Sequence, residues 1–104
     1  MVNRFDIFML NMDDGPNARD TRPCIVVSPD EMNAHLETVI IAPVSSVVRA
    51  YPTRIMFDFL GNRRAVVLDQ LLTVDKSRLT KKIGELDAAD RVATVEVLHE
   101  LFAA

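Results

Sequence analysis

The distribution of apolar residues predicts a chain built mainly from short strands. Short apolar or β-branched runs, separated by Gly, Pro, Asn, Asp and Ser, recur from the N-terminus to residue 86. The predicted strands are Arg4 to Leu10, Cys24 to Val27, Thr38 to Val44, Ile55 to Leu60, Ala65 to Leu68, Leu71 to Val74 and Lys82 to Leu86. The first run is apolar on both faces after Asp6, which is typical of a central strand. Pro43 predicts an edge strand or a bulge, because proline cannot donate to a sheet ladder.

The connections between these runs are of three kinds. Gly61-Asn62 predicts a tight hairpin turn, whereas Pro29 to Asn33 predicts one helical turn or a tight loop. Lys76 to Leu79 predicts a turn. The polar stretch Asn11 to Thr21 is long for a connection in a small protein, and long loops often carry function.

The last residues predict a helix. Asp87 is a plausible N-cap, and Asp90 adds a second acid near the positive end of the helix dipole. Val92, Val95, Leu98 and Phe102 recur every three or four residues and predict one apolar stripe facing the core. We therefore expect one domain over residues 1–104 of class α+β, with β-structure dominant: a small, partly open antiparallel barrel and one C-terminal helix.

The composition narrows the class of protein. Hydrophobic residues make up 49% and charged residues 26% of the 104 positions, as in ordinary soluble domains. No apolar run reaches the roughly 18 residues of a membrane span. The single cysteine, Cys24, excludes an internal disulfide, suits a reducing cytoplasm and is more typical of a small core residue than of a nucleophile. His35 and His99 lack partners at ligand spacing, and the three glycines are scattered, so we expect no metal and no cofactor.

Charge is unevenly distributed along the chain. The net charge is −3, yet residues 41–82 carry eight Lys/Arg against three Asp, between acidic segments on either side. A basic middle segment is compatible with a phosphate-binding face. It is equally compatible with ordinary surface charge on hairpin strands, and both interpretations stay open.

Polar residues gather at predicted strand ends. The group consists of Arg22, Ser45, Ser46, Asp69 and Gln70. If these ends share one rim of the barrel, a cation, hydroxyls and a carboxylate would suit a phosphodiester. Polar strand ends occur in every sheet, however, and Arg22 could instead cap an edge or pair with Asp20.

RNA adds a nucleophile of its own to such a rim, the ribose 2′-OH. Asp69 could act as the base, Arg22 could stabilise the phosphorane charge, and Ser45 or Ser46 could hydrogen-bond the phosphate, with no metal required. Tyr51, close to Arg49 and Arg54, could stack on a base of single-stranded RNA.

Five blocks in order along the chain carry a family resemblance. They are Arg22-Pro23-Cys24-Ile25-Val26-Val27-Ser28-Pro29-Asp30-Glu31-Met32-Asn33, Ile41-Ala42-Pro43-Val44-Ser45-Ser46, Tyr51-Pro52-Thr53-Arg54, Val67-Leu68-Asp69-Gln70 and Thr73-Val74-Asp75-Lys76-Ser77-Arg78-Leu79. Together they resemble the MazF/PemK toxins of type II toxin–antitoxin systems. The resemblance implies an SH3-like barrel, a homodimer, a small acidic antitoxin and a metal-independent endoribonuclease that cleaves single-stranded RNA to 2′,3′-cyclic phosphate and 5′-OH ends.

The resemblance also implies roles for individual residues. The family's catalytic Arg falls on Arg22, its catalytic Thr on Ser45, and the Asp that some members use as a base on Asp69. The remaining candidates for RNA contact are Arg19, Ser46, Arg49, Tyr51, Arg54 and Gln70. An Arg that some members carry two residues before the Asp is Val67 here, so their acid/base scheme does not transfer whole.

Two departures point to an alternative. The family's Arg-Gly-Asp opening is Arg4-Phe5-Asp6 here, and its Gly-x-Glu in the first loop is absent from residues 15–20. The opening is similar to that of CcdB, a toxin of the same fold that poisons DNA gyrase by binding. CcdB-type toxins typically end in Trp-Gly-Ile, whereas this chain contains no Trp and ends in Phe102-Ala103-Ala104.

Overall fold

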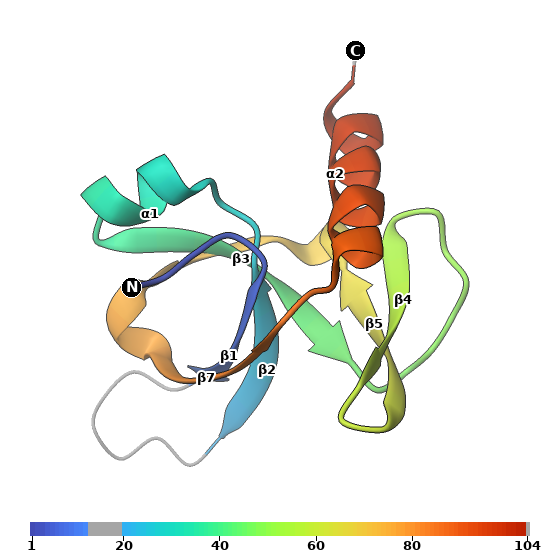
Figure 1. Ribbon diagram of the computed structural model, residues 1–104, viewed down its shortest axis with the longest axis horizontal. Helices are drawn as coiled ribbons and strands as arrows, with labels where there is room; N and C mark the ends of the chain where they lie inside the picture. Colours follow the sequence, from blue (N-terminus) through green and yellow to red (C-terminus); the bar gives the residue numbers. More distant parts are fainter. Residues whose placement is uncertain (13–19, 104) are drawn as a thin grey trace.

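The structure is a computed structural model that describes residues 1–12 and 20–103. Its strands are β1 (Asp6–Asn11), β2 (Thr21–Val26), β3 (Thr38–Ser45), β4 (Arg54–Phe59), β5 (Asn62–Val67), β6 (Leu72–Asp75) and β7 (Leu79–Glu85). The helices are α1 (Asp30–His35) and α2 (Ala88–Phe102), with short 3₁₀ segments η1 (Leu68–Gln70) and η2 (Lys76–Arg78). The strands pair antiparallel in the order β4-β5-β3-β2-β1-β7, and β6 pairs with β3. The sheet curls into a half-barrel with α2 beside it, which confirms the predicted β-dominant α+β class (Figure 1).

Strand β3 connects the two parts of the sheet. It pairs with β2 along one edge, while its other edge pairs first with β6, as far as Ile41, and then with β5, from Val44. Pro43 lies between these two residues, where the partner strand changes. β3 as a whole has neighbours on both sides, so it is not an edge strand as one alternative had it. Pro43 itself pairs with Cys24 of β2 and lies at the break between β6 and β5, so the proline stands where the ladder on that edge is interrupted.

The second half of β2, from Cys24 to Val26, is buried on both faces, which explains its apolar sequence. Ile25 packs into one core cluster with Ile7, whereas Cys24 and Val26 pack into a second cluster with Leu10. Alternate residues of a strand point to opposite faces, so one short run supplies both clusters. Cys24 is 1% exposed, and this burial raises the pKa of its thiol to about 12, which suits a core residue.

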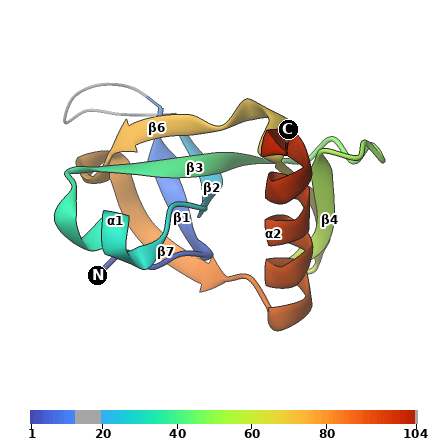
Figure 2. The same ribbon diagram turned by 90° about the horizontal axis from the view of Figure 1, so that it is seen from above.

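Helix α2 begins as predicted, and the face it turns to the core includes Leu98 of the predicted stripe but not Val92 or Phe102. The Asp87 carboxylate accepts a hydrogen bond from the Asp90 backbone N–H at 2.9 Å, so Asp87 is the N-cap. The helix lies beside β4 (Figure 2), and Val97, Leu98 and Leu101 pack against the core cluster of Ile7.

The buried centre of α2 is Thr94, whose hydroxyl donates to the Asp90 carbonyl at 2.8 Å. Two members of the predicted stripe, Val92 and Phe102, are instead 60% and 74% exposed. The stripe was misplaced because apolar residues surround much of this helix, and a polar Thr at its buried centre carries no hydrophobic signal.

Other boundaries shift by a few residues. The hairpin turn between β4 and β5 is Leu60-Gly61, with φ of +51° and +78°, one residue earlier than predicted. Two positive φ values match a type I′ turn, the form whose twist fits a two-residue hairpin. Strand β7 begins at Leu79 rather than at Lys82.

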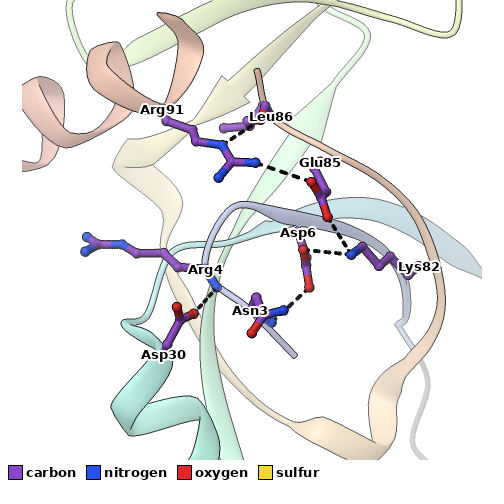
Figure 3. Close-up of polar contacts among 8 residues, drawn as sticks. All are labelled: Asn3, Arg4, Asp6, Asp30, Lys82, Glu85, Leu86 and Arg91. Carbon is purple, nitrogen blue, oxygen red and sulfur yellow. Dashed lines mark hydrogen bonds and ion pairs between the residues drawn. The ribbon is translucent and has the colours of Figure 1, made fainter. Parts of the chain in front are cut away.

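A polar cluster fastens the start of β1 to β7 (Figure 3). Asp6 is 2% exposed; its carboxylate accepts from the Asn3 backbone N–H at 2.8 Å and pairs with Lys82 Nζ at 3.2 Å. Lys82 also pairs with Glu85 at 2.8 Å, and Arg91 on α2 donates to the Leu86 carbonyl at 2.7 Å. The cluster therefore joins the first strand, the last strand and the helix.

Phe5, which replaces the glycine of the Arg-Gly-Asp opening, has a left-handed backbone with φ of +74°. The guanidinium carbons of Arg4 and Arg91 lie 5.3 and 5.5 Å from the centre of its ring. Contact with these cations and with the core offsets the backbone strain of a non-glycine residue at positive φ.

Candidate functional site

One open cavity of about 880 Å³ lies where the end of β3 meets β2, β5 and η1. Its wall includes Arg22 and Pro23 from β2, Val44 and Ser45 from β3, and Val67 from β5. The polar and aromatic side chains that line it are Asp20, Arg22, Ser45, Ser46, Arg49, Tyr51, Arg54, Arg64 and Gln70. Residues far apart in the sequence are thus brought to one concave surface.

The structure brings together most of the predicted site residues. Seven of them line the cavity: Arg22, Ser45, Ser46, Arg49, Tyr51, Arg54 and Gln70. Asp69 lies beside the cavity without lining it, although Val67 and Gln70 on either side do. Arg19 lies outside the described residues.

Arg22 is presented at the start of β2, where it pairs in register with Leu10 of β1. Its side chain is 67% exposed, and Nε lies 3.2 Å from Asp20 Oδ1, as the simpler alternative for Arg22 predicted. An ion pair with so much solvent contact contributes little stability. A phosphate, which offers a guanidinium bidentate hydrogen bonds, can therefore replace the carboxylate at small cost.

Ser45 is the last residue of β3 and is held by the ladder to Ala65 of β5. The Ser45 side-chain oxygen accepts a hydrogen bond from the Val47 backbone N–H at 3.0 Å, which fixes the turn into the following loop. This contact uses the oxygen as an acceptor and does not use the O–H donor. A half-buried hydroxyl with fixed position and a donor to offer can bind an anionic oxygen.

Tyr51, Arg54 and Asp69 form a connected unit. The Arg54 guanidinium carbon lies 4.8 Å from the centre of the Tyr51 ring, and Arg54 Nε lies 3.2 Å from Asp69 Oδ1. Thr53 donates its hydroxyl to the same Asp69 oxygen at 3.1 Å. The hydrogen bond from Arg54 is the main reason that the pKa of the Asp69 carboxyl lies below its ordinary value.

Sequence reasoning missed Arg64, which lines the cavity from β5 opposite Phe57. The signal was the excess of Lys/Arg in residues 41–82. Arg64 stands directly before the predicted strand at Ala65, whereas the structure begins β5 at Asn62 and places Arg64 inside it. Val67, which stands where some family members carry an arginine, is 3% exposed and apolar. Arg64 supplies a cation to the same cavity from a different position on the strand.

Among residues 1–12 and 20–103, the cavity wall carries the arginines Arg22, Arg49, Arg54 and Arg64 and the acid Asp20. This excess of positive charge favours an anionic ligand. Across residues 1–12 and 20–103, no group of three or more His, Cys, Asp or Glu side chains is arranged to hold a metal ion. In the same part of the chain no helix is both long and apolar enough to span a membrane.

Fold and site together define a small curled-sheet protein with a cationic, hydroxyl-bearing cavity at one rim. The family of PemK-like, MazF-like toxins of type II toxin–antitoxin systems matches residues 3–102, and the chain belongs to this family. Endoribonuclease EndoA of Bacillus subtilis (strain 168) is 30% identical over 95 residues, which cover 84% of this chain and 82% of EndoA.

Solved structures agree with this assignment. The Mycobacterium tuberculosis toxin MazF-mt6 superposes with a TM-score of 0.79 at 25% identity, over 93% of this chain and 95% of that one. A MazE-MazF structure from Deinococcus radiodurans superposes with a TM-score of 0.81 at 24% identity, over 98% and 95% of the two chains. The second match supports the fold alone.

Proposed function

We propose that this chain is an endoribonuclease toxin that cleaves single-stranded RNA without a metal, through attack of the ribose 2′-OH on the adjacent phosphate. Membership of the MazF/PemK family and similarity to EndoA support the class of activity. The products would carry a 2′,3′-cyclic phosphate and a 5′-OH. Cleavage of messenger RNA would take place in the cytoplasm.

The observation that carries this proposal is the convergence of Arg22 and Ser45 on one cavity with an excess of cations. Attack by the 2′-OH puts additional negative charge on the phosphate oxygens. A guanidinium that exchanges the exposed Asp20 carboxylate for the phosphate, and a hydroxyl donor held at the end of β3, stabilise this charge.

The catalytic roles follow from the chemistry of each group. Arg22 stabilises the phosphorane, and Ser45 hydrogen-bonds a non-bridging oxygen. Ser46, Arg49, Arg54 and Gln70 contact the backbone or bases on either side, and Tyr51 stacks on one base. The 2′-OH loses a proton as it attacks, and the departing 5′-oxygen gains one. Asp69 stays the predicted general base, but its contacts favour another role that is described below. In that case water in the open cavity would accept the first proton and supply the second.

The test is cleavage of a mixed single-stranded RNA by purified protein in EDTA. Arg22→Ala should lower kcat about 100-fold or more, because charge stabilisation in the transition state is lost. Arg63→Ala is the matched control. Arg63 is an exposed arginine that pairs with Asp58, and Arg63 does not line the cavity. Cleavage by wild type and Arg63→Ala but not by Arg22→Ala supports the proposal, and full activity of Arg22→Ala refutes the assigned site.

The same assay addresses the alternative of a CcdB-like toxin that binds DNA gyrase. Absence of cleavage by the wild-type protein, together with gyrase inhibition, would favour that alternative. In that case toxicity should depend on residues 101–104 and not on Arg22.

A small acidic antitoxin is the partner that we propose for this toxin. One structural relative is an endoribonuclease in complex with its cognate antitoxin, and others are MazE-MazF complexes. An acidic segment of an antitoxin would be attracted to the arginine-rich cavity wall. RNA and antitoxin should then compete, which a displacement assay with labelled RNA would detect.

We also propose a homodimer. Leu98 and Phe102 of α2, with Val27, Ile40 and Leu71, line a second hollow of about 540 Å³ that is mostly apolar. Phe102 is 74% exposed there, which is unusual for a residue of its size. Sedimentation equilibrium should give twice the mass of the chain, and Phe102→Asp should shift the equilibrium toward monomer.

A further inference from the structure

Asp69 occupies a position that argues against proton abstraction. It lies in η1, between β5 and β6, and its side chain does not line the cavity. Asp69 Oδ1 accepts hydrogen bonds from Thr53 Oγ1 at 3.1 Å and Arg54 Nε at 3.2 Å. A general base must reach the proton that it removes and hold a pKa near the working pH.

The contacts of Asp69 lead instead to Tyr51. Arg54 lies between them, bonded to the carboxylate on one side and stacked against the Tyr51 ring at 4.8 Å on the other. The Arg54 side chain is 17% exposed and that of Asp69 34%, whereas the Arg22–Asp20 pair is 67% and 53% exposed. The more buried pair is the one that holds a fixed geometry, because solvent screens it less.

The backbone around this pair is also fixed. Arg54 pairs in register with Val67, the Leu68 N–H donates to the Thr53 carbonyl at 3.2 Å, and the Arg54 N–H donates to the Tyr51 carbonyl at 3.1 Å. These bonds join η1 to the end of the loop that carries Tyr51. Tyr51 itself is 45% exposed and lines the cavity, so its ring has surface to offer a ligand.

We infer that Asp69 is a positioning residue: it holds Arg54 against Tyr51 and so immobilises an aromatic platform on which one RNA base stacks. This inference rests on the proposed function, because it assigns a substrate contact to the same cavity. A platform held in place before binding loses less conformational entropy when the base stacks. The unit recognises a base through its flat face and is therefore tolerant of sequence at that position.

The test compares kcat, KM and the pH profile of cleavage for variants of this unit. Tyr51→Ala should raise KM about tenfold, as expected for loss of one stacked base. Asp69→Ala should raise KM by a similar factor with a much smaller change in kcat, and the double variant should be no worse than Tyr51→Ala alone. Asp69→Asn keeps an oxygen acceptor for Arg54 and Thr53, so it should raise KM only about threefold and leave the shape of the pH profile unchanged.

Asp58→Asn is the matched control, because Asp58 is an aspartate on the same strand as Arg54, paired with Arg63 at 3.3 Å and outside the cavity. It should behave as wild type. A loss of about 100-fold in kcat for Asp69→Asn, with the acid limb of the pH profile removed, would make Asp69 the base and overturn the inference. Asp69→Asn is close to isosteric and answers the question even if Asp69→Ala does not fold.

Binding of a short fluorescent single-stranded RNA, followed by anisotropy, separates this inference from the proposed cleavage. If the wild type binds RNA without cleaving it, and Tyr51→Ala and Asp69→Ala weaken binding non-additively, the platform stands and the cleavage proposal fails. Additive losses, or no loss, would overturn the platform whether or not the RNA is cut. Failure of the wild type to bind RNA at all would overturn both.

Discussion

Replacement of Asp6 tests the polar cluster that joins β1 to β7. Asp6 is 2% exposed and accepts from the Asn3 N–H at 2.8 Å and from Lys82 Nζ at 3.2 Å. Asp6→Ala removes one backbone bond, worth about 1 kcal/mol, and one charge-assisted bond, worth about 1.5–3 kcal/mol. The Lys82 side chain is 40% exposed and can regain water, which reduces the second figure. We expect a loss of about 2–3 kcal/mol for Asp6→Ala and about 1 kcal/mol for Asp6→Asn, which keeps an acceptor.

Urea unfolding at constant protein concentration measures the loss in free energy of unfolding. In a separate thermal scan, the melting temperature of Asp6→Ala should fall by roughly 10–20 °C. Lys82→Met provides the second arm of a double-mutant cycle, and a coupling energy of at least about 0.5 kcal/mol would assign the effect to the pair. A loss below about 0.5 kcal/mol for Asp6→Ala would refute the claim that this cluster holds the two strands together.

Three further outcomes follow from single residues. Leu60→Asn should stabilise the protein by about 0.5–1 kcal/mol in urea unfolding. Leu60 has φ of +51° in a two-residue turn, a position that favours asparagine, and its side chain is 76% exposed. An unchanged or lower urea midpoint would contradict this. Burial raises the pKa of the Cys24 thiol to about 12. The thiol should therefore react with a disulfide reagent at pH 8 only as fast as the protein opens. Rapid labelling of the folded protein would refute the burial of Cys24. Ser45→Ala should lower kcat about 10- to 100-fold. Ser45→Thr keeps the hydroxyl and should keep most of the activity. Equal rates for the wild type and both variants would remove Ser45 from the mechanism.

Much of the fold could be predicted from the sequence, because a strand segment that is buried on both faces has a continuous run of apolar residues. The second half of β2, from Cys24 to Val26, is an uninterrupted apolar run because its two faces meet different core clusters. The face of α2 could not be predicted in the same way. Thr94 can be fully buried because its hydroxyl donates a hydrogen bond to the Asp90 carbonyl. A threonine satisfied in this way gives no apolar signal in the sequence.

Cavity-lining residues at strand ends could be predicted from the sequence. Residues whose position depends on contacts between distant segments could not. Arg22 and Ser45 end predicted strands and do line the cavity. Arg64 stands directly before the predicted strand at Ala65 but lies inside β5, and it reaches the wall because β5 pairs with the end of β3. The carboxylate of Asp69 is occupied by Thr53 and Arg54, a contact between a loop and η1 that spacing in the sequence does not show.

The central claim is that the 2′-OH of the substrate is the nucleophile in the Arg22 cavity. The most direct measurement uses two RNAs that differ only in a 2′-deoxy nucleotide on the 5′ side of the cleaved bond, incubated in EDTA with wild type and Arg22→Ala, with product masses read by mass spectrometry. Wild type should cut only the all-ribose RNA, leaving a 2′,3′-cyclic phosphate and a 5′-OH, and Arg22→Ala should cut neither RNA at a comparable rate. Cleavage of the 2′-deoxy RNA, or products with a 5′-phosphate, would contradict it.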